Sequence, residues 1–304
     1  MEEYDVAIIG AGPGGLTAGI YCARYGLKTI IIEKGITGGT TTLAGRIHNY
    51  PGFIDTSGME LMKLFEEQAK KAGAIIENEA VSKIIDKNES KEIQMQEKTI
   101  KSKVVIVSVG AKSKWLKVKG EKEYLNKGVH FCATCDGPMY NGKEVVVIGS
   151  DNRASEEAIY LSTVTKKATL ISPKKELTAD AAKQKALAER KIDVVLGAIV
   201  TSFEGKGVLS SITLKTRDGK EEKLSCSGAF VYIGSEPNTE FVNVKKDPEG
   251  RIIVNSSMET SVKGILACGD CIKKDLYQIA TCVGEGATAA FTASKYIHNQ
   301  IGNE

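Results

Sequence analysis

The chain has 304 residues, and the usual size of a protein domain therefore predicts two domains. Hydrophobic residues make up 42% and charged residues 26%, a balance typical of folded globular proteins that argues against disorder. The net charge of +3 is too small to indicate a nucleic-acid partner. The acidic start and the lack of any apolar run of about 18 residues predict neither an export signal nor a membrane span. We therefore expect a cytoplasmic protein.

The beginning of the chain has the pattern of a strand–helix–strand unit. Residues 5–10 (D-V-A-I-I-G) form a short apolar run typical of a buried parallel strand, and residues 16–25 resemble a helix. A second strand is expected at 28–33, and two parallel strands joined through a helix need a right-handed crossover. The N-terminal part is therefore expected to be doubly wound.

The same pattern recurs near the middle of the chain. Strands are expected at 143–149 and 168–172, on either side of a helix at 154–162. The chain thus contains two strand–helix–strand units of the same kind.

The second unit is expected to be inserted into the first. A buried strand at 103–110 precedes it, and the apolar run 265–267 follows it, ahead of a glycine- and alanine-rich helix starting at Gly284. We expect an α/β fold of two Rossmann-like three-layer dinucleotide-binding domains. The expected bounds are 1–114 and 241–304 for the first domain and 115–240 for the inserted one.

A glycine motif lies between the first strand and the first helix. Gly10, Gly12 and Gly15 fit G-x-G-x-x-G, in which the first glycine permits a tight turn, the second lets backbone approach a pyrophosphate and the third allows close packing. The helix N-terminus offers amide groups and a positive dipole end to phosphates. Glu33 ends the second strand, where a carboxylate can bind ribose hydroxyls. We therefore expect a dinucleotide site here.

The downstream residues indicate which dinucleotide binds. Gly269-Asp270 follows an apolar run, where a carboxylate can reach a ribityl hydroxyl, and the helix from Gly284 is expected to direct its dipole at a flavin. The turns Gly38-Gly39-Thr40 and Asn49-Tyr50-Pro51-Gly52 expose more backbone. These residues resemble the FAD domain of disulfide reductases that have two dinucleotide domains. The resemblance implies FAD as the first ligand.

A pair of cysteines forms the chemical centre of the sequence. Cys132 and Cys135 are separated by two residues, and thiols at this spacing can close a disulfide when their Cα atoms lie within about 4.4–6.8 Å. A C-x-x-C motif often lowers the pKa of one thiol. Asp136, directly after the second cysteine, is a candidate proton donor and acceptor. We expect a redox-active disulfide.

The alternative reading of these cysteines is a structural zinc site. Such a site needs a second pair, for which Cys268 and Cys271 are the candidates. That pair overlaps the Gly269-Asp270 motif, so we expect both cysteines to be small core residues and expect no metal site. The same interpretation applies to Cys22, Cys226 and Cys282.

The motif C-A-T-C-D-G between two Rossmann-like units resembles the low-molecular-weight thioredoxin reductases, a family of FAD disulfide reductases. The likeness includes the first glycine motif, N-Y-P-G at 49–52, the helix 156–162, G-S-E-P-N-T at 234–239 and Gly269-Asp270. It implies that Cys135 is the flavin-facing sulfur, that Cys132 attacks the disulfide of the partner thioredoxin and that Asp136 shuttles the proton. It also implies a homodimer.

The resemblance implies a set of residues around FAD. The cofactor-binding set is Gly10, Gly12, Pro13, Gly14, Gly15, Glu33, Lys34, Gly39, Thr40, Asn49, Val81, Gly110, Gly269, Asp270, Gln278 and Ile279.

The second glycine motif departs from the family pattern, in which it binds NADPH. It reads G-S-D-N-R-A at 149–154, with Asp151 where a bare glycine is expected against the pyrophosphate. Like charges 4 Å apart at an effective dielectric of about 20 cost about 4 kcal/mol. After the next strand, Pro173, Lys174 and Lys175 occupy the region where the family has arginines that grip the 2′-phosphate.

This loss makes the chain most like the ferredoxin-dependent flavin thioredoxin reductases, which lack an NADPH site. The resemblance implies reduced ferredoxin as electron donor and thioredoxin as acceptor. Ferredoxins are usually acidic, and lysines are candidates to steer their docking. The candidates are Lys166, Lys167, Lys174 and Lys175.

Three other functions stay open. The chain is alternatively a conventional NAD(P)H-dependent thioredoxin reductase with a divergent site, a flavin dithiol oxidase that acts on a small molecule, or a non-catalytic FAD-binding module. His130 lies two residues before Cys132, where it could tune the thiolate, although a packed or hydrogen-bonded histidine is the more frequent case. Tyr277 has no assigned role.

Overall fold

The computed structural model describes residues 1–44 and 47–301. The chain divides into two compact units, one made of Met1–Lys112 and Glu236–Glu304 and the other of Ser113–Ser235. The divisions fall before residues 113 and 236, where the sequence-based bounds place them before 115 and 241. The chain crosses between the units along β7 and β16, which pair with each other. Their bounds are Ala111–Ser113 for β7 and Ser235–Pro237 for β16.

The first unit is built on a sheet whose strand order is β3-β2-β1-β6-β5-β4, with β17 also paired to β6. Strands β3, β2, β1, β6 and β17 run parallel, and β4 and β5 join antiparallel. The strands are β1 (Glu3–Ile9), β2 (Thr29–Glu33), β3 (Ile75–Asn78), β4 (Val81–Asp86), β5 (Lys91–Met95), β6 (Thr99–Val107) and β17 (Ile265–Ala267).

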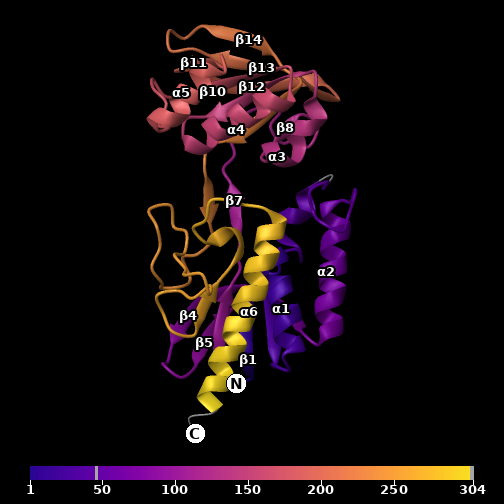
Figure 1. Ribbon diagram of the computed structural model, residues 1–304, viewed down its shortest axis with the longest axis vertical. Coiled ribbons are helices and arrows are strands. Elements are labelled where there is room, and N and C mark those ends of the chain that lie inside the picture. The colour runs from indigo at the N-terminus through magenta and orange to yellow at the C-terminus, as the bar shows by residue number, and fades with distance from the viewer. Residues whose placement is uncertain (45–46, 302–304) are drawn as a thin grey trace. The chain divides into compact units, whose positions relative to one another are not determined.

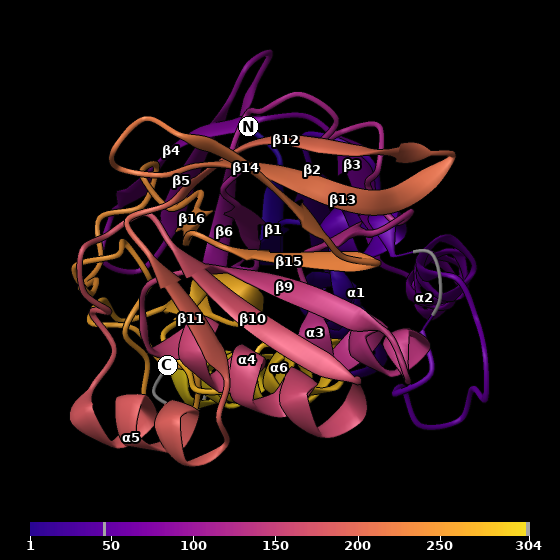
Figure 2. The same cartoon turned by 90° about the horizontal axis from the view of Figure 1, so that it is seen from above.

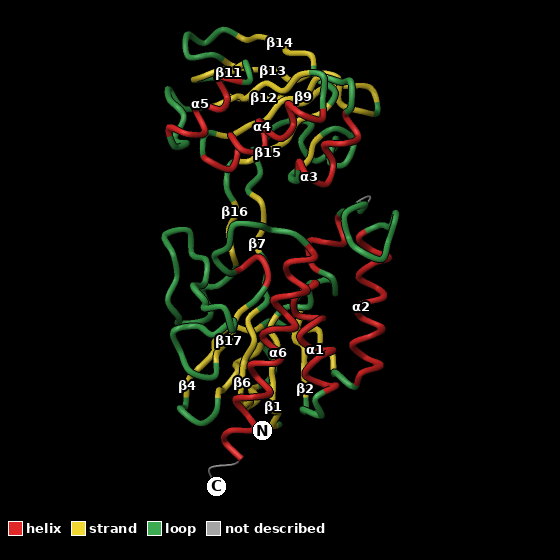
Figure 3. Tube along the Cα trace, viewed as in Figure 1, coloured by secondary structure: helices red, strands yellow, loops and turns green. Residues whose placement is uncertain are grey.

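Three helices cover one face of this sheet. They are α1 (Pro13–Arg24), α2 (Gly58–Ala72) and α6 (Ile279–Ile301), and Figure 1 shows α1 between the other two. Strand side chains such as Ile8 and Ile106 pack with Leu16 of α1 and Ala293 of α6, whereas Ile9 and Val107 face a second core on the other side. The alternation along buried parallel strands therefore produces the layers that the sequence predicts. Figure 3 shows that the stretch between β16 and β17 is mostly loop.

Two elements of the first unit differ from the sequence-based expectation. Strand β6 ends at Val107 rather than at residue 110, and Gly110, three residues further on, has a φ of 62°, a left-handed conformation that no strand continues. Helix α6 begins at Ile279 rather than at Gly284. The glycines at 284 and 286 therefore do not start this helix. A Cβ at Gly286 would overlap the carbonyl of Gly14, so this glycine lets α6 approach α1 closely.

The second unit has a parallel sheet of order β11-β10-β9-β15-β8 between two outer layers. Figure 2 shows α4 and α5 on one side of it and the antiparallel β12, β13 and β14 on the other. Its strands are β8 (Val129–His130), β9 (Glu144–Gly149), β10 (Lys167–Ser172), β11 (Asp193–Leu196), β12 (Ile199–Lys206), β13 (Val208–Lys215), β14 (Glu221–Ser225) and β15 (Gly228–Tyr232). Its helices are α3 (Ala133–Asp136), α4 (Asn152–Val164) and α5 (Ala181–Glu189), with the 3₁₀ turn η2 (Gly137–Tyr140) after α3.

Candidate active site

The glycines of the turn after β1 are required for different steric reasons. A Cβ at Gly10 would overlap the carbonyl of Ser108, and a Cβ at Gly15 would overlap the carbonyl of Gly10. A Cβ at Gly12, in contrast, would have no atom of the described chain within 4 Å. Gly10 and Gly15 therefore serve packing, while Gly12 leaves its backbone open to a ligand.

The first turn of α1 fits a phosphate group. Gly12 is its N-cap and Pro13 occupies the first turn, and no side chain of the described residues caps the helix. The first amides of a helix need partners, and the positive end of the helix dipole favours an anion there. The loop that contains Gly39 lies beside this turn, since the amide of Gly38 donates to the carbonyl of Ala11 at 2.7 Å. The site therefore fits the pyrophosphate of FAD.

Glu33 lies at the carboxyl end of β2, next to the same turn. Its Oε2 accepts a 2.8 Å hydrogen bond from the amide of Ala11, and its Oε1 accepts a 2.9 Å bond from the amide of Gly35. A carboxylate has about four lone-pair positions, so acceptor capacity remains for ribose hydroxyls. Glu33 thus both braces the glycine turn and presents a charged acceptor.

Asp270 lies in η3 (Gly269–Cys271), directly after β17, within a small polar cluster. Its Oδ1 lies 3.2 Å from the Nζ of Lys274 and accepts a 3.2 Å hydrogen bond from the thiol of Cys282. Lys274 also donates to both oxygens of Glu285, at 3.0 and 2.9 Å, and Glu285 accepts the amide of Gly269 at 2.8 Å. Burial acts to lower the pKa of Lys274, but the neighbouring thiol and carboxylates raise it above its ordinary value. The cluster fixes the Gly-Asp turn.

The other predicted cofactor residues lie on neighbouring segments of the same unit. Asn49 donates a 3.0 Å hydrogen bond to the side chain of Gln278, which directly precedes Ile279, the first residue of α6. Val81 begins β4, Gly110 follows β6, and both Lys34 and Thr40 are exposed. Because the parallel strands β1, β2, β6 and β17 end on the same side of the sheet, their following turns form one edge. This is where α/β folds bind dinucleotides.

The cysteines of the C-x-x-C motif form a disulfide in the second unit. Cys132 and Cys135 have a Cα–Cα distance of 5.3 Å, and Cys132 is the N-cap of the one-turn helix α3. The amide of Cys135 donates to the sulfur of Cys132 at 3.3 Å. An amide that points at a sulfur stabilises the thiolate that forms when the disulfide is reduced. The motif thus sits in a frame suited to thiol–disulfide exchange.

A buried tyrosine, Tyr232, forms a hydrogen bond with the start of helix α3. The hydroxyl of Tyr232, at the end of β15, accepts a 2.6 Å hydrogen bond from the amide of Ala133 and also hydrogen-bonds with Glu157 of α4. Burial raises the pKa of both Tyr232 and Glu157. No sequence motif singled out Tyr232, because it meets Ala133 only through the pairing of distant strands.

Asp136 ends α3 and faces a buried histidine. Its Oδ2 lies 3.0 Å from the Nδ1 of His130, while the Nε2 of His130 lies 2.7 Å from the hydroxyl of Tyr140. The side chain of His130 is 1% exposed and that of Asp136 is 20% exposed. The sequence suggested Cys132 as the group that His130 could tune, but the structure shows Asp136 as its ionisable neighbour.

The second glycine turn, after β9, is closed by its own side chains. Asp151 is the N-cap of α4, and its Oδ1 accepts a 3.0 Å hydrogen bond from the amide of Ala154. The amide and the hydroxyl of Thr178 both donate to the carbonyl of Ser150, at 2.7 and 3.1 Å. The amide of Asp180 donates to the side chain of Asn152 at 2.7 Å. This turn therefore differs from the uncapped turn of α1, since the carboxylate of Asp151 occupies one of the first amides of α4.

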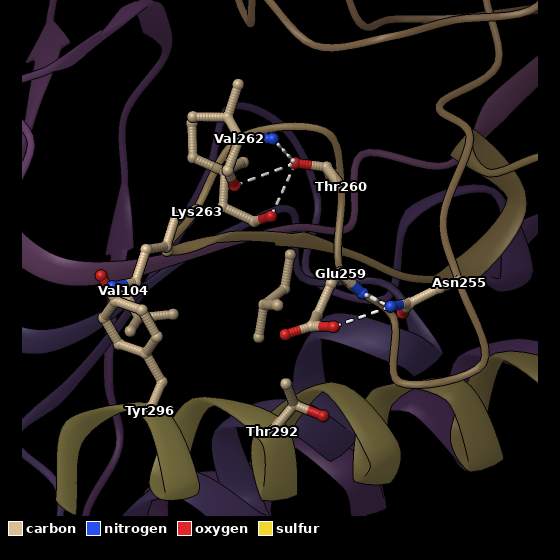
Figure 4. A pocket seen from close by; sticks show the side chains of 11 residues that line it. Val104, Asn255, Glu259, Thr260, Val262, Lys263, Thr292 and Tyr296 are labelled. Carbon is tan, nitrogen blue, oxygen red and sulfur yellow. Dashed lines mark hydrogen bonds between the residues drawn. The ribbon is translucent and has the colours of Figure 1, made fainter. Parts of the chain in front are cut away.

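Beyond these sites, the first unit has a pocket of about 300 Å³ lined by the 255–264 loop, β17 and α6 (Figure 4). Asn255, Glu259, Lys263 and Tyr296 contribute to its wall, and none of the residues that line it belongs to the predicted cofactor set. The described part of the chain contains no cluster of three or more side chains that could hold a metal ion. Nor does any helix within residues 1–44 and 47–301 have the length and apolarity needed to cross a membrane.

Comparison with known proteins identifies the family of this chain. The family model for pyridine nucleotide-disulphide oxidoreductases matches residues 4–286. The thioredoxin reductase of Bacillus subtilis is 39% identical over 299 residues, which cover 97% of this chain and 95% of that protein. The crystal structure of thioredoxin reductase from Streptococcus pyogenes has a TM-score of 0.92 at 35% identity and covers 98% of this chain and 99% of that chain. A ferredoxin-flavin thioredoxin reductase from Clostridium acetobutylicum is similar at 33% identity and a TM-score of 0.55, with 98% and 99% covered.

The two Rossmann-like units, one with a glycine turn that fits FAD and one with a disulfide, define a flavin-dependent disulfide oxidoreductase of the α/β class. The matches show that the chain belongs to the pyridine nucleotide-disulphide oxidoreductase family and, within it, to the thioredoxin reductases. The expected fold, the resemblance to the low-molecular-weight thioredoxin reductases, the class of enzyme and FAD as cofactor are confirmed.

Proposed function

We propose that the protein reduces thioredoxin through the Cys132–Cys135 disulfide, with electrons that its bound FAD supplies. The observation that carries this proposal is the disulfide itself, held on a one-turn helix beside a carboxylate, in a chain whose full-length relatives are thioredoxin reductases. FAD, when bound, supplies a two-electron carrier. In this proposal Cys135 receives the electron pair, and Cys132 leaves as a thiolate.

Cys132 then attacks the thioredoxin disulfide, and Cys135 resolves the mixed disulfide. Each attack forms one S–S bond and breaks another, so two electrons pass to thioredoxin and Cys132–Cys135 is restored. Cys132 caps the helix, and the amide of Cys135 points at its sulfur, which stabilises a thiolate at this position. Asp136 is proposed to exchange the protons. The family resemblance further supports a homodimer that works in the cytoplasm.

Reduced ferredoxin is the electron donor that we propose for this enzyme. The capped turn of α4 supports this choice, because Asp151 takes an amide that a pyrophosphate would need and adds a negative charge. Pro173, Lys174 and Lys175 supply no guanidinium group for a 2′-phosphate. The similarity to the ferredoxin-flavin enzyme of Clostridium acetobutylicum points the same way.

The four surface lysines differ in how much positive charge they offer to an acidic ferredoxin. Lys166 lies 3.0 Å from Glu144, and Lys167 lies 2.7 Å from Asp193, so neighbouring carboxylates offset both charges. Lys174 and Lys175 are exposed on the loop after β10. We therefore assign electrostatic steering of an acidic donor to Lys174 and Lys175.

NADPH is the competing donor, and the name of the matched family, which refers to pyridine nucleotides, favours it. An anaerobic assay separates the two. Holoenzyme is mixed with oxidised thioredoxin and either NADPH or photoreduced ferredoxin, and thioredoxin thiols are counted. We expect thiols with ferredoxin and none above background with NADPH. Rapid, saturable turnover with micromolar NADPH would refute the ferredoxin assignment, and no thiols with either donor or with photoreduced holoenzyme would refute thioredoxin reduction.

A further inference from the structure

The chemistry proposed for Asp136 requires a proton at neutral pH that an ordinary carboxyl group does not hold. Reducing a disulfide to a dithiol consumes two protons, so a nearby group must deliver one to the departing sulfur. Free aspartic acid titrates near 3.9, whereas free imidazole titrates near 6.5, within the range where most enzymes work. A carboxyl group alone is therefore a poor proton store at neutral pH, and an imidazole is a good one.

The structure places an imidazole at that position. His130 is the last residue of β8. This strand pairs with β15, and His130 lies opposite Phe230 in the pairing, so the backbone fixes where the ring lies. The ring stacks on Phe230 with a centroid distance of 5.3 Å and an interplanar angle of 27°, and it is closed off from solvent. Asp136, at 3.0 Å from Nδ1, links the ring to the partly exposed end of α3.

The two ring nitrogens of His130 have different partners. Nε2 lies 2.7 Å from the hydroxyl of Tyr140, whose pKa burial raises to about 12, with the charge of Asp136 adding to the rise. Tyr140 therefore keeps its proton at neutral pH. Nδ1 is buried and has no well-directed hydrogen bond among the described residues, although the carboxylate oxygen lies 3.0 Å away. A buried ring nitrogen beside a carboxylate, with no other partner, is where a shared proton can reside.

We propose that His130 is the positioning residue for Asp136 and stores the proton that Asp136 delivers to the dithiol. The proton moves from Nδ1 of His130 to Oδ2 of Asp136 and from that carboxyl to the thiolate that reduction releases. When thioredoxin oxidises the dithiol, Asp136 takes a proton back and returns it to Nδ1. No electron passes through either residue, and this inference rests on the function proposed above.

The other ionisable groups around the pair are accounted for. Lys143 lies over the ring of Tyr140 at 5.7 Å, and Cys226, whose pKa burial raises to about 12, is the other acidic group near Tyr140. On the far side of α3, Tyr232 and Glu157 hydrogen-bond with each other. Tyr232 and Cys226 keep their protons at neutral pH, and His130 is the residue of this cluster whose ring nitrogen lies 3.0 Å from the carboxylate of Asp136.

The test compares His130→Asn with wild-type holoenzyme, both reduced photochemically so that no external donor is involved. The rate of thioredoxin thiol formation is followed from about pH 6 to about pH 8. Dividing the variant rate by the wild-type rate at each pH cancels the pH effects of all groups that the two proteins have in common. A free imidazole holds its proton at the acid end of this range and has lost it at the alkaline end. We therefore expect the ratio to lie at least about tenfold below one at the acid end and to rise toward one at the alkaline end. His298→Asn, on the exposed last turns of α6, is the matched control and should give a flat ratio.

A second measurement needs no substitution at His130. The chain has three histidines, so isotope labelling of histidine gives three imidazole signals. We expect one of them to change its protonation state at neutral pH between the disulfide and dithiol forms, and to lose this change in Asp136→Asn. A flat rate ratio in folded His130→Asn, or three histidine signals unaffected by reduction, would overturn the inference. Wild-type enzyme that reduces no thioredoxin at any pH would instead overturn the proposed function.

Discussion

The hydroxyl of Tyr232 accepts a 2.6 Å hydrogen bond from the amide of Ala133, the first residue of the helix between Cys132 and Asp136. Both groups are buried, and the two residues are 99 positions apart in the chain. The bond satisfies an amide at the helix start that has no partner within the helix. It therefore ties the redox-active turn to the central sheet of the second unit.

We predict that Tyr232→Phe lowers the free energy of unfolding by about 1–3 kcal/mol, since it leaves the buried amide of Ala133 without an acceptor. It should also alter the alkylation rate of Cys132 in the reduced enzyme, because the helix that frames its thiolate loses its anchor. Urea unfolding and iodoacetamide labelling measure the two effects. Tyr124→Phe is the control: its hydroxyl donates to the carbonyl of Gly205 at 2.9 Å in the same unit, away from the disulfide. Equal labelling rates in both variants would contradict the role of Tyr232.

The cap of α4 gives a prediction on nucleotide binding. Asp151→Gly frees the amide of Ala154 and removes a negative charge, so we expect NADPH to bind at least about tenfold more tightly than to wild type. Fluorescence titration with NADPH measures the change. Ser57→Gly removes the same kind of cap from α2 in the first unit, where the hydroxyl of Ser57 accepts the amide of Glu60 at 3.2 Å, and should leave NADPH binding unchanged. An equal response of both variants would show that Asp151 does not block the turn.

The two backbone bonds of Glu33 predict a measurable loss of cofactor. In Glu33→Gln the amide side chain cannot accept from both Ala11 and Gly35 and has no charge for the ribose, so FAD affinity should fall about 10- to 100-fold. Release of fluorescent FAD on dilution reports the affinity. Glu79→Gln, which changes an exposed carboxylate that accepts the amide of Glu97 at 2.7 Å, should retain the cofactor. Retention of FAD by Glu33→Gln would remove Glu33 from the site.

The hairpin of β4 and β5 contains a pH-dependent ion pair. The ammonium of Lys91 is fully buried and lies 2.9 Å from Asp86, whose pKa its hydrogen bond holds below the ordinary value of 3.8. A carboxyl group whose pKa is lowered by folding stabilises the fold above its unfolded pKa and loses that effect as the pH falls through the folded pKa. Asp86→Asn should therefore cost about 1–3 kcal/mol at neutral pH and progressively less below about pH 4. Urea unfolding at both pH values measures this.

Glu92→Gln is the control on the same hairpin. It removes an exposed pair in which Lys87 lies 3.8 Å from Glu92, and it should change stability by less than about 1 kcal/mol. A cost of Asp86→Asn that does not depend on pH would contradict the ion pair.

The sequence predicted the local structure around the first glycine motif, because a strand, a tight turn and a helix follow one another within a single unit. The cofactor roles of its glycines and of Glu33 stay predictions. The start of α6 could not be predicted, because Gly286 looks like a helix boundary in sequence and is a contact with Gly14 in the fold. That distinction depends on a neighbour about 270 residues away, which no local pattern contains.

The surroundings of the disulfide were the least predictable part. The sequence singled out His130 because it lies two residues before Cys132. In the structure its ionisable neighbour is Asp136, which α3 brings to 3.0 Å from the ring. Tyr232 carries no motif at all, and its position follows from the pairing of β15 with β9. Contacts of this kind arise from the packing of elements that are distant in the chain. The periodicity and spacing of the sequence do not predict them.

Thiol counting on photoreduced enzyme tests most directly whether electrons reach thioredoxin through Cys132 and Cys135. Anaerobic holoenzyme carrying one reduced FAD is mixed with one equivalent of oxidised thioredoxin, and the new thiols of thioredoxin are counted. We predict two thiols per FAD for wild type and for the buried-cysteine control Cys22→Ser. For Cys135→Ser we predict one thiol at most, released when the Cys132 thiolate attacks thioredoxin and stays bound to it as a mixed disulfide, while the FAD remains reduced. Two thiols per FAD from Cys135→Ser would contradict the account.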